Sequence, residues 1–246
     1  MTKLPFGAAA IVAAVAGAER VLDAGCGSGR LTVALAEAGA AVTGVDTNAE
    51  QLAVAARRAS AADVALELLE ADFNSALPFP EPWFDAVVSR LSVMAATDPV
   101  ATLRELGRVL APGGRIVTAL WALPAENPWF AVPREAIGVV LGAERAAFAR
   151  AFGKLGDPEE AAEAHRAAGF VVVEAVLLRG SRSAPDAAAY WAELSKENGH
   201  FRRIDTVLSD DERADLVAEL DARFGPYRDG DHLVLPRTMV VVTARR

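Results

Sequence analysis

A glycine-rich loop directly after a short apolar run restricts the fold of this chain more than any other segment. The run ends at Asp23, and the loop reads Gly-x-Gly-x-Gly over Gly25–Gly29. Glycines let the backbone turn sharply and let a ligand approach the main chain closely. A strand, a tight glycine turn and a helix in this order favour an α/β fold that binds a nucleotide-like ligand.

Apolar runs of strand length alternate with longer helical patterns through the first half of the sequence. Gly39 is placed to stop one helix, and Asn48 and Asp98 are placed to cap two others. This alternation predicts a parallel sheet with helices on both faces and right-handed crossovers. The predicted strands are 20–23, 41–46, 64–70, 84–89 and 115–121, the predicted helices are 29–38, 49–59 and 99–110, and proline-rich or glycine-rich turns are predicted at 78–82 and 112–114.

The second half of the sequence is less regular. We expect an irregular stretch over 124–133, a helix from Asp157-Pro158 to Gly169, a strand over 170–178 and a strand or hairpin over 232–244. Residues 181–225 read as mostly helical. The sequence therefore predicts one domain over 1–246, with a helical insertion at 181–225 that covers a substrate site.

Composition narrows the function classes. Apolar residues make up 52% of the chain and the formal net charge is −8. An acidic surface repels phosphate backbones, so no nucleic-acid partner is expected. The single cysteine excludes an intramolecular disulfide and fits a reducing cytoplasm. The apolar segment 7–18 is interpreted as a short helix rather than a signal peptide, and no run is long enough to span a membrane.

The chemistry of the loop argues against a dinucleotide. A dinucleotide fingerprint reads G-x-G-x-x-G, whereas the residue after Gly29 is Arg30. Asp23, two residues before Gly25, would repel a pyrophosphate and attract an ammonium group. The loop therefore suits a cofactor with an amino-acid end.

Further acidic residues follow the next two predicted strands. Asp46 ends the second strand, 17 residues beyond Gly29, where a carboxylate can accept hydrogen bonds from a ribose diol. Asp72 could accept from an exocyclic amine, and Phe73 offers an apolar face to a purine. Together these side chains fit an adenosine with a positively charged amino-acid tail.

These residues resemble the class I S-adenosylmethionine-dependent methyltransferases, in particular the small-molecule group similar to ubiquinone and menaquinone biosynthesis methyltransferases. The resemblance is close over roughly residues 20–121 and looser beyond. The matching motifs are VLDAGCGSG at 21–29, VTGVDTNAEQL at 42–52, ADF at 71–73, FDAVVSR at 84–90 and RVLAPGG at 108–114.

The resemblance implies a Rossmann-like, seven-stranded, mostly parallel sheet whose last strand is antiparallel. It implies that Asp46 binds the ribose with Thr47 and Gln51 beside it, and that Asp72 and Phe73 hold the adenine. The residues that would line the methionine end or the reacting centre are Gly25, Cys26, Gly27, Ser89 and Arg90. For Cys26 we expect a structural role rather than a reactive one.

Residues of the second half supply weaker candidates for the acceptor. Trp129 and Trp191 are either core residues or part of the substrate pocket. His200 is the one histidine proposed to contact substrate or act as a base, whereas His165 is expected on a helix surface. No cluster of His, Cys and acidic residues has metal-ligand spacing, so no metal is predicted.

The function that these features predict is methyl transfer from S-adenosylmethionine to a small-molecule acceptor by in-line displacement. Two alternatives stay open: an enzyme of the same fold that catalyses a cyclisation or decarboxylation, and a binding protein with a vestigial site. Residues 124–156, residues 181–225, or a partner subunit in a homodimer would close the site.

Overall fold

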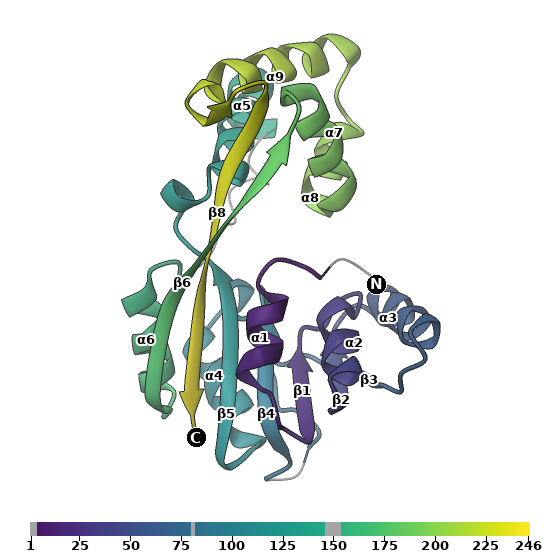
Figure 1. Ribbon diagram of the computed structural model, residues 1–246, viewed down its shortest axis with the longest axis vertical. Coiled ribbons are helices and arrows are strands. Elements are labelled where there is room, and N and C mark those ends of the chain that lie inside the picture. Colours follow the sequence, from purple (N-terminus) through teal and green to yellow (C-terminus); the bar gives the residue numbers. More distant parts are fainter. Residues whose placement is uncertain (1–3, 80–81, 146–153) are drawn as a thin grey trace. The chain divides into compact units, whose positions relative to one another are not determined.

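The computed structural model describes residues 4–79, 82–145 and 154–246 (Figure 1). Positions 80 and 81 of the predicted turn at 78–82, and positions 146–153 of the predicted 124–156 cover, lie outside these residues. The described residues fall into two compact units. The sheet unit comprises those within 1–122, 153–178 and 239–246, and the helical unit those within 123–152 and 179–238.

The sheet has the strand order β3-β2-β1-β4-β5-β8-β6, with the short β7 paired to β8. Strands β1 to β5 pair with one another in parallel, and β8 runs antiparallel to β5. The predicted Rossmann-like sheet with an antiparallel last strand is therefore confirmed. The strands are β1 Arg20–Ala24, β2 Ala41–Asp46, β3 Glu67–Glu70, β4 Phe84–Arg90, β5 Leu110–Trp121, β6 Val171–Ala184, β7 Arg228–Asp229 and β8 His232–Arg245.

Helices connect these strands in the order that the alternating pattern predicts. Within the sheet unit they are α1 Ala8–Ala14, α2 Arg30–Glu37, α3 Ala49–Ala61, the 3₁₀ turn η1 Val93–Ala95, α4 Pro99–Arg108 and α6 Pro158–Ala167. Within the helical unit they are η2 Pro124–Glu126, α5 Pro128–Arg145, α7 Ala187–Glu197, α8 Gly199–Asp205, α9 Asp210–Arg223 and η4 Gly225–Tyr227. The last three α-helices occupy most of the predicted insertion.

The strands are apolar at consecutive positions because both faces of the sheet are buried. Val21 of β1 belongs to a core cluster that also holds residues of α1 and α2. Its neighbour Leu22 belongs to a second cluster that holds residues of α4 and α6. Side chains alternate between the two faces of a strand, so one short apolar run supplies both cores.

Local capping sets where several helices begin. The side chain of Asn48 accepts a hydrogen bond from the backbone N–H of Gln51 at 3.1 Å, and that of Asp98 accepts one from Ala101 at 3.0 Å. Both caps were predicted from sequence and are confirmed. Each satisfies an N–H that has no partner within its own helix.

Several boundaries differ from the prediction. The strand predicted over 170–178 continues as β6 to Ala184, into the segment that was predicted to be helical from 181. The stretch 124–133 was expected to be irregular, but α5 begins at Pro128 and passes through Pro133. Strand β5 begins at Leu110 rather than Arg115, and its pairing with β4 shifts register between Phe84 and Ala86. The predicted glycine turn therefore lies inside one strand, where its pairing with β4 is irregular.

The expectation for His165 was wrong. Its side chain is fully buried on α6, where Nδ1 lies 2.7 Å from the carbonyl oxygen of Ala161 and Nε2 lies 3.1 Å from Oγ1 of Thr118. The polar neighbours of His165 in sequence point elsewhere on the helix. Burial lowers the pKa of His165 from 6.5 to about 4.

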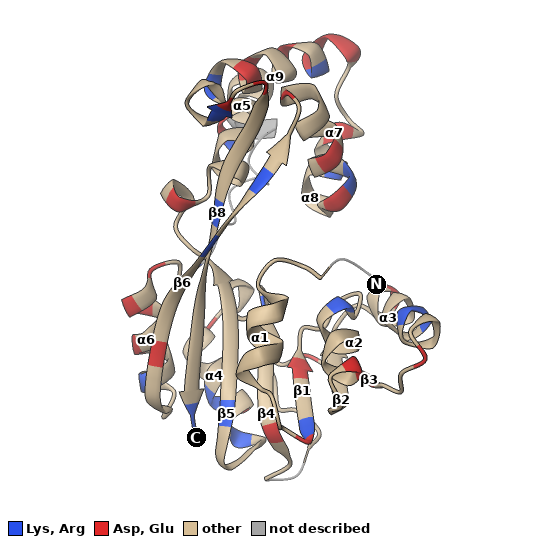
Figure 2. Ribbon diagram, viewed as in Figure 1, with Lys and Arg blue, Asp and Glu red and all other residues tan. Residues whose placement is uncertain are grey.

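Charges of both signs are spread over the two units. Figure 2 shows Lys and Arg interspersed with Asp and Glu along the helices and strands. Among the described residues, no helix is both long enough and apolar enough to cross a membrane.

Candidate active site

The predicted cofactor residues meet where parallel strands end. Asp23 on β1 pairs in register with Gly44 on β2 and with Val88 on β4. The carboxyl ends of β1, β2 and β4, with Asp23, Asp46 and Arg90, therefore lie at one edge of the sheet. Strand order reverses direction between β1 and β4, and ligands of such sheets bind at that point.

The glycine loop is closed by hydrogen bonds from its own amides. The N–H groups of Gly25 and Cys26 both donate to the carbonyl oxygen of Val45, at 2.8 and 2.9 Å. The N–H of Gly27 donates to Oδ2 of Asp46 at 2.8 Å, and that of Gly29 donates to the carbonyl oxygen of Cys26 at 3.0 Å. Amides that already have acceptors do not form a phosphate-binding nest. This geometry supports the argument against a pyrophosphate.

Asp46 links the loop to the next helix. Its Oδ2 accepts from Gly27, and its Oδ1 accepts from the N–H of Asn48 at 2.9 Å. Each carboxylate oxygen has a further lone pair, so the side chain can still accept from a diol. Thr47 and Gln51 are exposed beside it.

Asp23 is buried at the end of β1, with 1% of its surface exposed. Its Oδ2 accepts a hydrogen bond from Oγ1 of Thr32 at 2.7 Å. The pKa of Asp23 is raised from 3.8 to about 6, chiefly by burial; Thr32 and the charge of Arg90 lower it in part, and Asp46 adds to the rise. A buried carboxylate with a raised pKa is stabilised by any cation that binds beside it.

Cys26 packs against β2 and has no features of a nucleophile. A Cβ at Gly44 would stand 3.0 Å from Sγ of Cys26 and 3.0 Å from Cδ2 of Leu68, so glycine at 44 makes room for the thiol. Burial, together with Asp23 and Asp46, raises the pKa of Cys26 to about 12. The thiol is therefore neutral, which supports the structural role expected from sequence.

The segment after β3 brings Phe73 to the glycine loop. The ring of Phe73 is buried, and its Cε1 would lie 3.2 Å from a Cβ at Gly25. Asp72 is exposed, and its Oδ1 accepts from the backbone and side-chain nitrogens of Asn74, each at 2.8 Å. Asn74 in turn accepts from Oγ1 of Thr102 at 2.9 Å, which ties this turn to α4.

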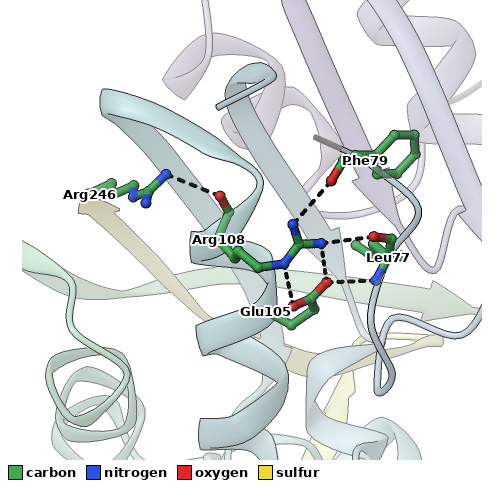
Figure 3. A network of polar contacts seen from close by, with 5 residues as sticks. All are labelled: Leu77, Phe79, Glu105, Arg108 and Arg246. Carbon is green, nitrogen blue, oxygen red and sulfur yellow. Dashed lines mark hydrogen bonds and ion pairs between the residues drawn. The ribbon is translucent and has the colours of Figure 1, made fainter. Parts of the chain in front are cut away.

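A polar network fastens the continuation of that segment (Figure 3). Arg108 donates to both carboxylate oxygens of Glu105 at 2.8 and 2.6 Å, and to the carbonyl oxygens of Leu77 and Phe79 at 2.8 and 3.1 Å. The N–H of Leu77 donates to Glu105 at 2.6 Å. Burial alone would raise the pKa of Glu105, but these bonds and the charge of Arg108 outweigh it and lower the pKa.

Ser89 and Arg90 end β4 and hold neighbouring elements. Ser89 is fully buried, and its Oγ donates to the carbonyl oxygen of Ala24 at 2.9 Å. Nε of Arg90 donates to the carbonyl oxygen of Phe6 at 2.9 Å, so the segment before α1 is attached to the same edge. Phe6 also stacks on Trp121, with ring centroids 6.2 Å apart.

Sequence reasoning missed one residue of this edge, Ser92. Its Oγ donates to the carbonyl oxygen of Gly25 at 3.1 Å. The preceding residue, Leu91, has φ of 66°, which turns the chain toward the loop. A polar residue just beyond a strand that ends at this edge was the available signal, but the unusual backbone at Leu91 has no signature in the sequence.

In the helical unit, the three residues proposed to contact the methyl acceptor, Trp129, Trp191 and His200, lie around Phe130 and Phe201. Ring centroids are 5.6 Å apart for Trp129 and Phe130, 5.3 Å for Phe130 and Phe201, 5.9 Å for Trp191 and Phe201, and 5.5 Å for His200 and Phe201. Both tryptophans are buried, and their indole N–H groups donate to Asn127 and Asp205 at 2.9 and 2.7 Å. His200 is half-buried; burial lowers its pKa, and Arg203 and Arg134 lower it further.

The described part of the chain holds no group of three or more His, Cys, Asp or Glu side chains arranged to bind a metal ion.

The first half of the chain is similar in sequence to known methyltransferases. Residues 22–118 match a family model described as a methyltransferase domain. A demethylmenaquinone methyltransferase of Thermus thermophilus is 40% identical over 124 residues, which is 50% of this chain and 52% of that protein. The chain thus spans about half the length of the curated relatives it matches.

Solved structures share the fold across nearly the whole chain. The YcgJ protein of Bacillus subtilis has a TM-score of 0.64 at 17% identity and covers 97% of each chain. Geranyl diphosphate C-methyltransferase of Streptomyces coelicolor, solved with S-adenosyl-L-homocysteine, has a TM-score of 0.54 at 21% identity, covering 97% of this chain and 78% of that one.

Proposed function

We propose that this chain, whose residues 22–118 match the methyltransferase domain model, transfers a methyl group from S-adenosylmethionine to a small organic acceptor. One observation carries the proposal. The amides of the glycine loop already have acceptors within the chain, and two carboxylates, Asp23 and Asp46, lie beside the loop at one edge of the sheet. This arrangement offers negative charge rather than free amides, so it suits a cationic amino-acid tail joined to a ribose.

Each predicted residue has a distinct part in holding the cofactor. Asp46 accepts from the ribose hydroxyls, with Thr47 and Gln51 beside it. Asp23 places negative charge next to the methionine end, lined by Gly25, Cys26 and Gly27. The side chain of Phe73 packs near the loop on the adenine side, with Asp72 as the acceptor for the exocyclic amine. Ser89 and Arg90 bound the region of the reacting centre.

The sulfonium supplies an already activated methyl group when the cofactor is bound, so the protein has little covalent chemistry to do. Its residues mainly align the acceptor and exclude water, and holding reactants in near-attack geometry can lower a barrier by roughly 7–11 kcal/mol. A base is needed only where the acceptor must lose a proton, and His200 or a carboxylate could serve. The pKa of His200 is lowered, so its imidazole is neutral near pH 7 and able to accept a proton.

Trp129 and Trp191 are proposed to contribute to the apolar surroundings of the acceptor. Residues 181–225, including α7 to α9, serve as the cover, with residues 124–156 or a partner subunit of a homodimer as alternatives. The protein is proposed to act in the cytoplasm. Phenols and hydroquinones form the first acceptor panel, because a relative acts on demethylmenaquinone by its name.

The direct test is binding of S-adenosylmethionine by calorimetry to the wild type and to Asp46→Ala. Removing an acceptor of several hydrogen bonds should weaken binding by about tenfold or more. Asp85→Ala is the matched control: Oδ2 of Asp85 also accepts a backbone N–H, from Arg20 at 2.8 Å, but at the amino-terminal edge of the sheet. Unchanged affinity in Asp46→Ala would remove the ribose assignment.

Product analysis separates methyl transfer from the alternatives. Incubation of the full chain with methyl-labelled cofactor and the acceptor panel should yield labelled product together with S-adenosylhomocysteine. An unlabelled product that is cyclised or decarboxylated, with the cofactor unchanged, would instead favour an enzyme of the same fold that catalyses cyclisation or decarboxylation. Absence of any cofactor binding by the wild type would favour a vestigial site.

A further inference from the structure

The glycine loop has no room for a side chain at the point where Ser92 lies against it. A Cβ at Gly25 would stand 2.1 Å from Oγ of Ser92, far inside van der Waals contact, and 3.2 Å from Cε1 of Phe73. Gly25 also has φ of +76°, which other residues rarely adopt. Glycine is therefore required at position 25 by contact as well as by backbone conformation.

The peptide group between Gly25 and Cys26 is held at both ends. Its carbonyl oxygen accepts from Oγ of Ser92 at 3.1 Å, and its N–H donates to the carbonyl oxygen of Val45 at 2.9 Å. A peptide group is planar, so two hydrogen bonds on opposite sides fix its orientation. One bond comes from the segment after β4 and the other from β2. These strands flank β1 on its two sides, so the peptide is held from both sides at the place where the strand order reverses.

Backbone strain presents Ser92 to the loop. Leu91 has φ of 66°, a left-handed conformation that is unfavourable for a residue with a branched side chain. The N–H of Leu91 donates to the carbonyl oxygen of Ala119 on β5 at 2.8 Å, which holds the turn in place. Such conformations persist where surrounding contacts enforce them, and they occur preferentially at functional sites.

We infer that Ser92 is a positioning residue for the cofactor: through the carbonyl of Gly25 it fixes the Gly25–Cys26 peptide against which the methionine end of S-adenosylmethionine binds. The inference rests on the proposed function, since it concerns the same site. It assigns Ser92 no contact with the reacting atoms. Its effect should appear in cofactor affinity and in the order of the loop.

The test compares Ser92→Ala, the hydroxyl-retaining Ser92→Thr, and Ser195→Ala as the matched control. Ser195 lies in the helical unit, and its Oγ likewise donates to a backbone carbonyl, that of Ala192, at 3.2 Å. Calorimetry should show affinity for S-adenosylmethionine about fivefold to tenfold weaker in Ser92→Ala, as expected for one neutral hydrogen bond. Ser92→Thr should stay within about twofold of the wild type, and Ser195→Ala should bind normally.

Hydrogen exchange supplies a readout that needs no ligand and no activity. Without cofactor, the amide hydrogen of Cys26 should exchange faster in Ser92→Ala than in the wild type, while amides of β5 exchange as before. Wild-type affinity in Ser92→Ala together with unchanged exchange at Cys26 would overturn the inference and leave the proposed function intact. Failure of the wild type to bind the cofactor would instead overturn both.

Discussion

The hydroxyl of Tyr190 donates a hydrogen bond to the carbonyl oxygen of Trp129, which lies four residues before Pro133. Proline has no N–H, so the i→i−4 bond that would use this carbonyl cannot form. A side chain from α7 therefore completes the first turns of α5. The tolerance of α5 for Pro133 is a tertiary effect.

Tyr190→Phe should accordingly destabilise the protein. The buried carbonyl of Trp129 would lose the hydrogen bond from Tyr190, at a cost of about 0.5–1.5 kcal/mol. Urea unfolding measures the change, with Tyr227→Phe at the other tyrosine as the control. Equal stability of Tyr190→Phe and wild type would show that this carbonyl finds another donor.

His165 should make the protein sensitive to mild acid. Its pKa falls from 6.5 to about 4 on folding because burial disfavours the charged ring. The folded state binds a proton at His165 less well than the unfolded chain does. The free energy of unfolding should therefore be highest above about pH 6.5 and should decrease as the pH falls toward 4. The full effect is on the order of 3 kcal/mol.

Unfolding midpoints measured from pH 4 to pH 8 test this expectation. His165→Gln should flatten the slope between pH 4 and pH 6.5, even if it lowers stability throughout. His232→Gln is the control, since His232 is exposed at the start of β8. A wild-type slope retained in His165→Gln would assign the acid sensitivity to other groups.

Asp23 should make the affinity for the cofactor depend on pH, because burial raises the pKa of its carboxyl group. Burial raises its pKa from 3.8 to about 6, so its contribution to stability is present below pH 3.8 and is lost as the pH rises through 6. A bound cation favours the ionised carboxylate. Affinity for S-adenosylmethionine should therefore fall as the pH drops below about 6.

Calorimetry between pH 5 and pH 8 tests this dependence. Asp23→Asn should bind more weakly and show a flatter profile, because the titrating group is gone. A wild-type affinity that stays constant over this range would contradict the role of Asp23 beside the ammonium group.

Cys26 should be inert toward thiol reagents in the folded protein. The raised pKa of about 12 leaves almost no thiolate at pH 8, and the side chain is buried. A chromogenic disulfide reagent should label the chain only after denaturant is added. Rapid labelling under native conditions would show that the loop opens.

The network around Arg108 should stabilise the segment after Phe73. Arg108→Met removes the donors to Glu105, Leu77 and Phe79 while keeping an apolar stem of similar length. We expect a loss of about 2–4 kcal/mol, because Glu105 is left without its paired charge. Hydrogen exchange should rise in residues 74–79, and Arg166→Met, which breaks an exposed pair with Glu159, should change stability by less than about 1 kcal/mol.

Features decided by near neighbours could be predicted from the sequence. The caps at Asn48 and Asp98 depend on amides three residues away, and the alternation of strands and helices depends on local apolar pattern. The same holds for the position of Asp46, which ends a strand. The hydrogen bond that Asp46 accepts from Gly27, 19 residues earlier, follows once the strands are placed side by side.

Features decided by distant partners could not be predicted in this way. His165 is buried by its contact with Thr118, 47 residues away, although its own helix reads as polar. Pro133 reads as a break until Tyr190 is known to supply the missing hydrogen bond. Ser92 reaches Gly25 across 67 residues through a turn that no residue type in the sequence announces.

The internally bonded glycine loop has a thermodynamic consequence. Since Gly25, Cys26, Gly27 and Gly29 already have acceptors within the chain, the entropy lost in ordering these residues is lost during folding rather than on ligand capture. The loop already has its binding conformation before the ligand arrives. Association should then be limited by diffusion and by the motion of other segments, with no slow rearrangement of the loop itself.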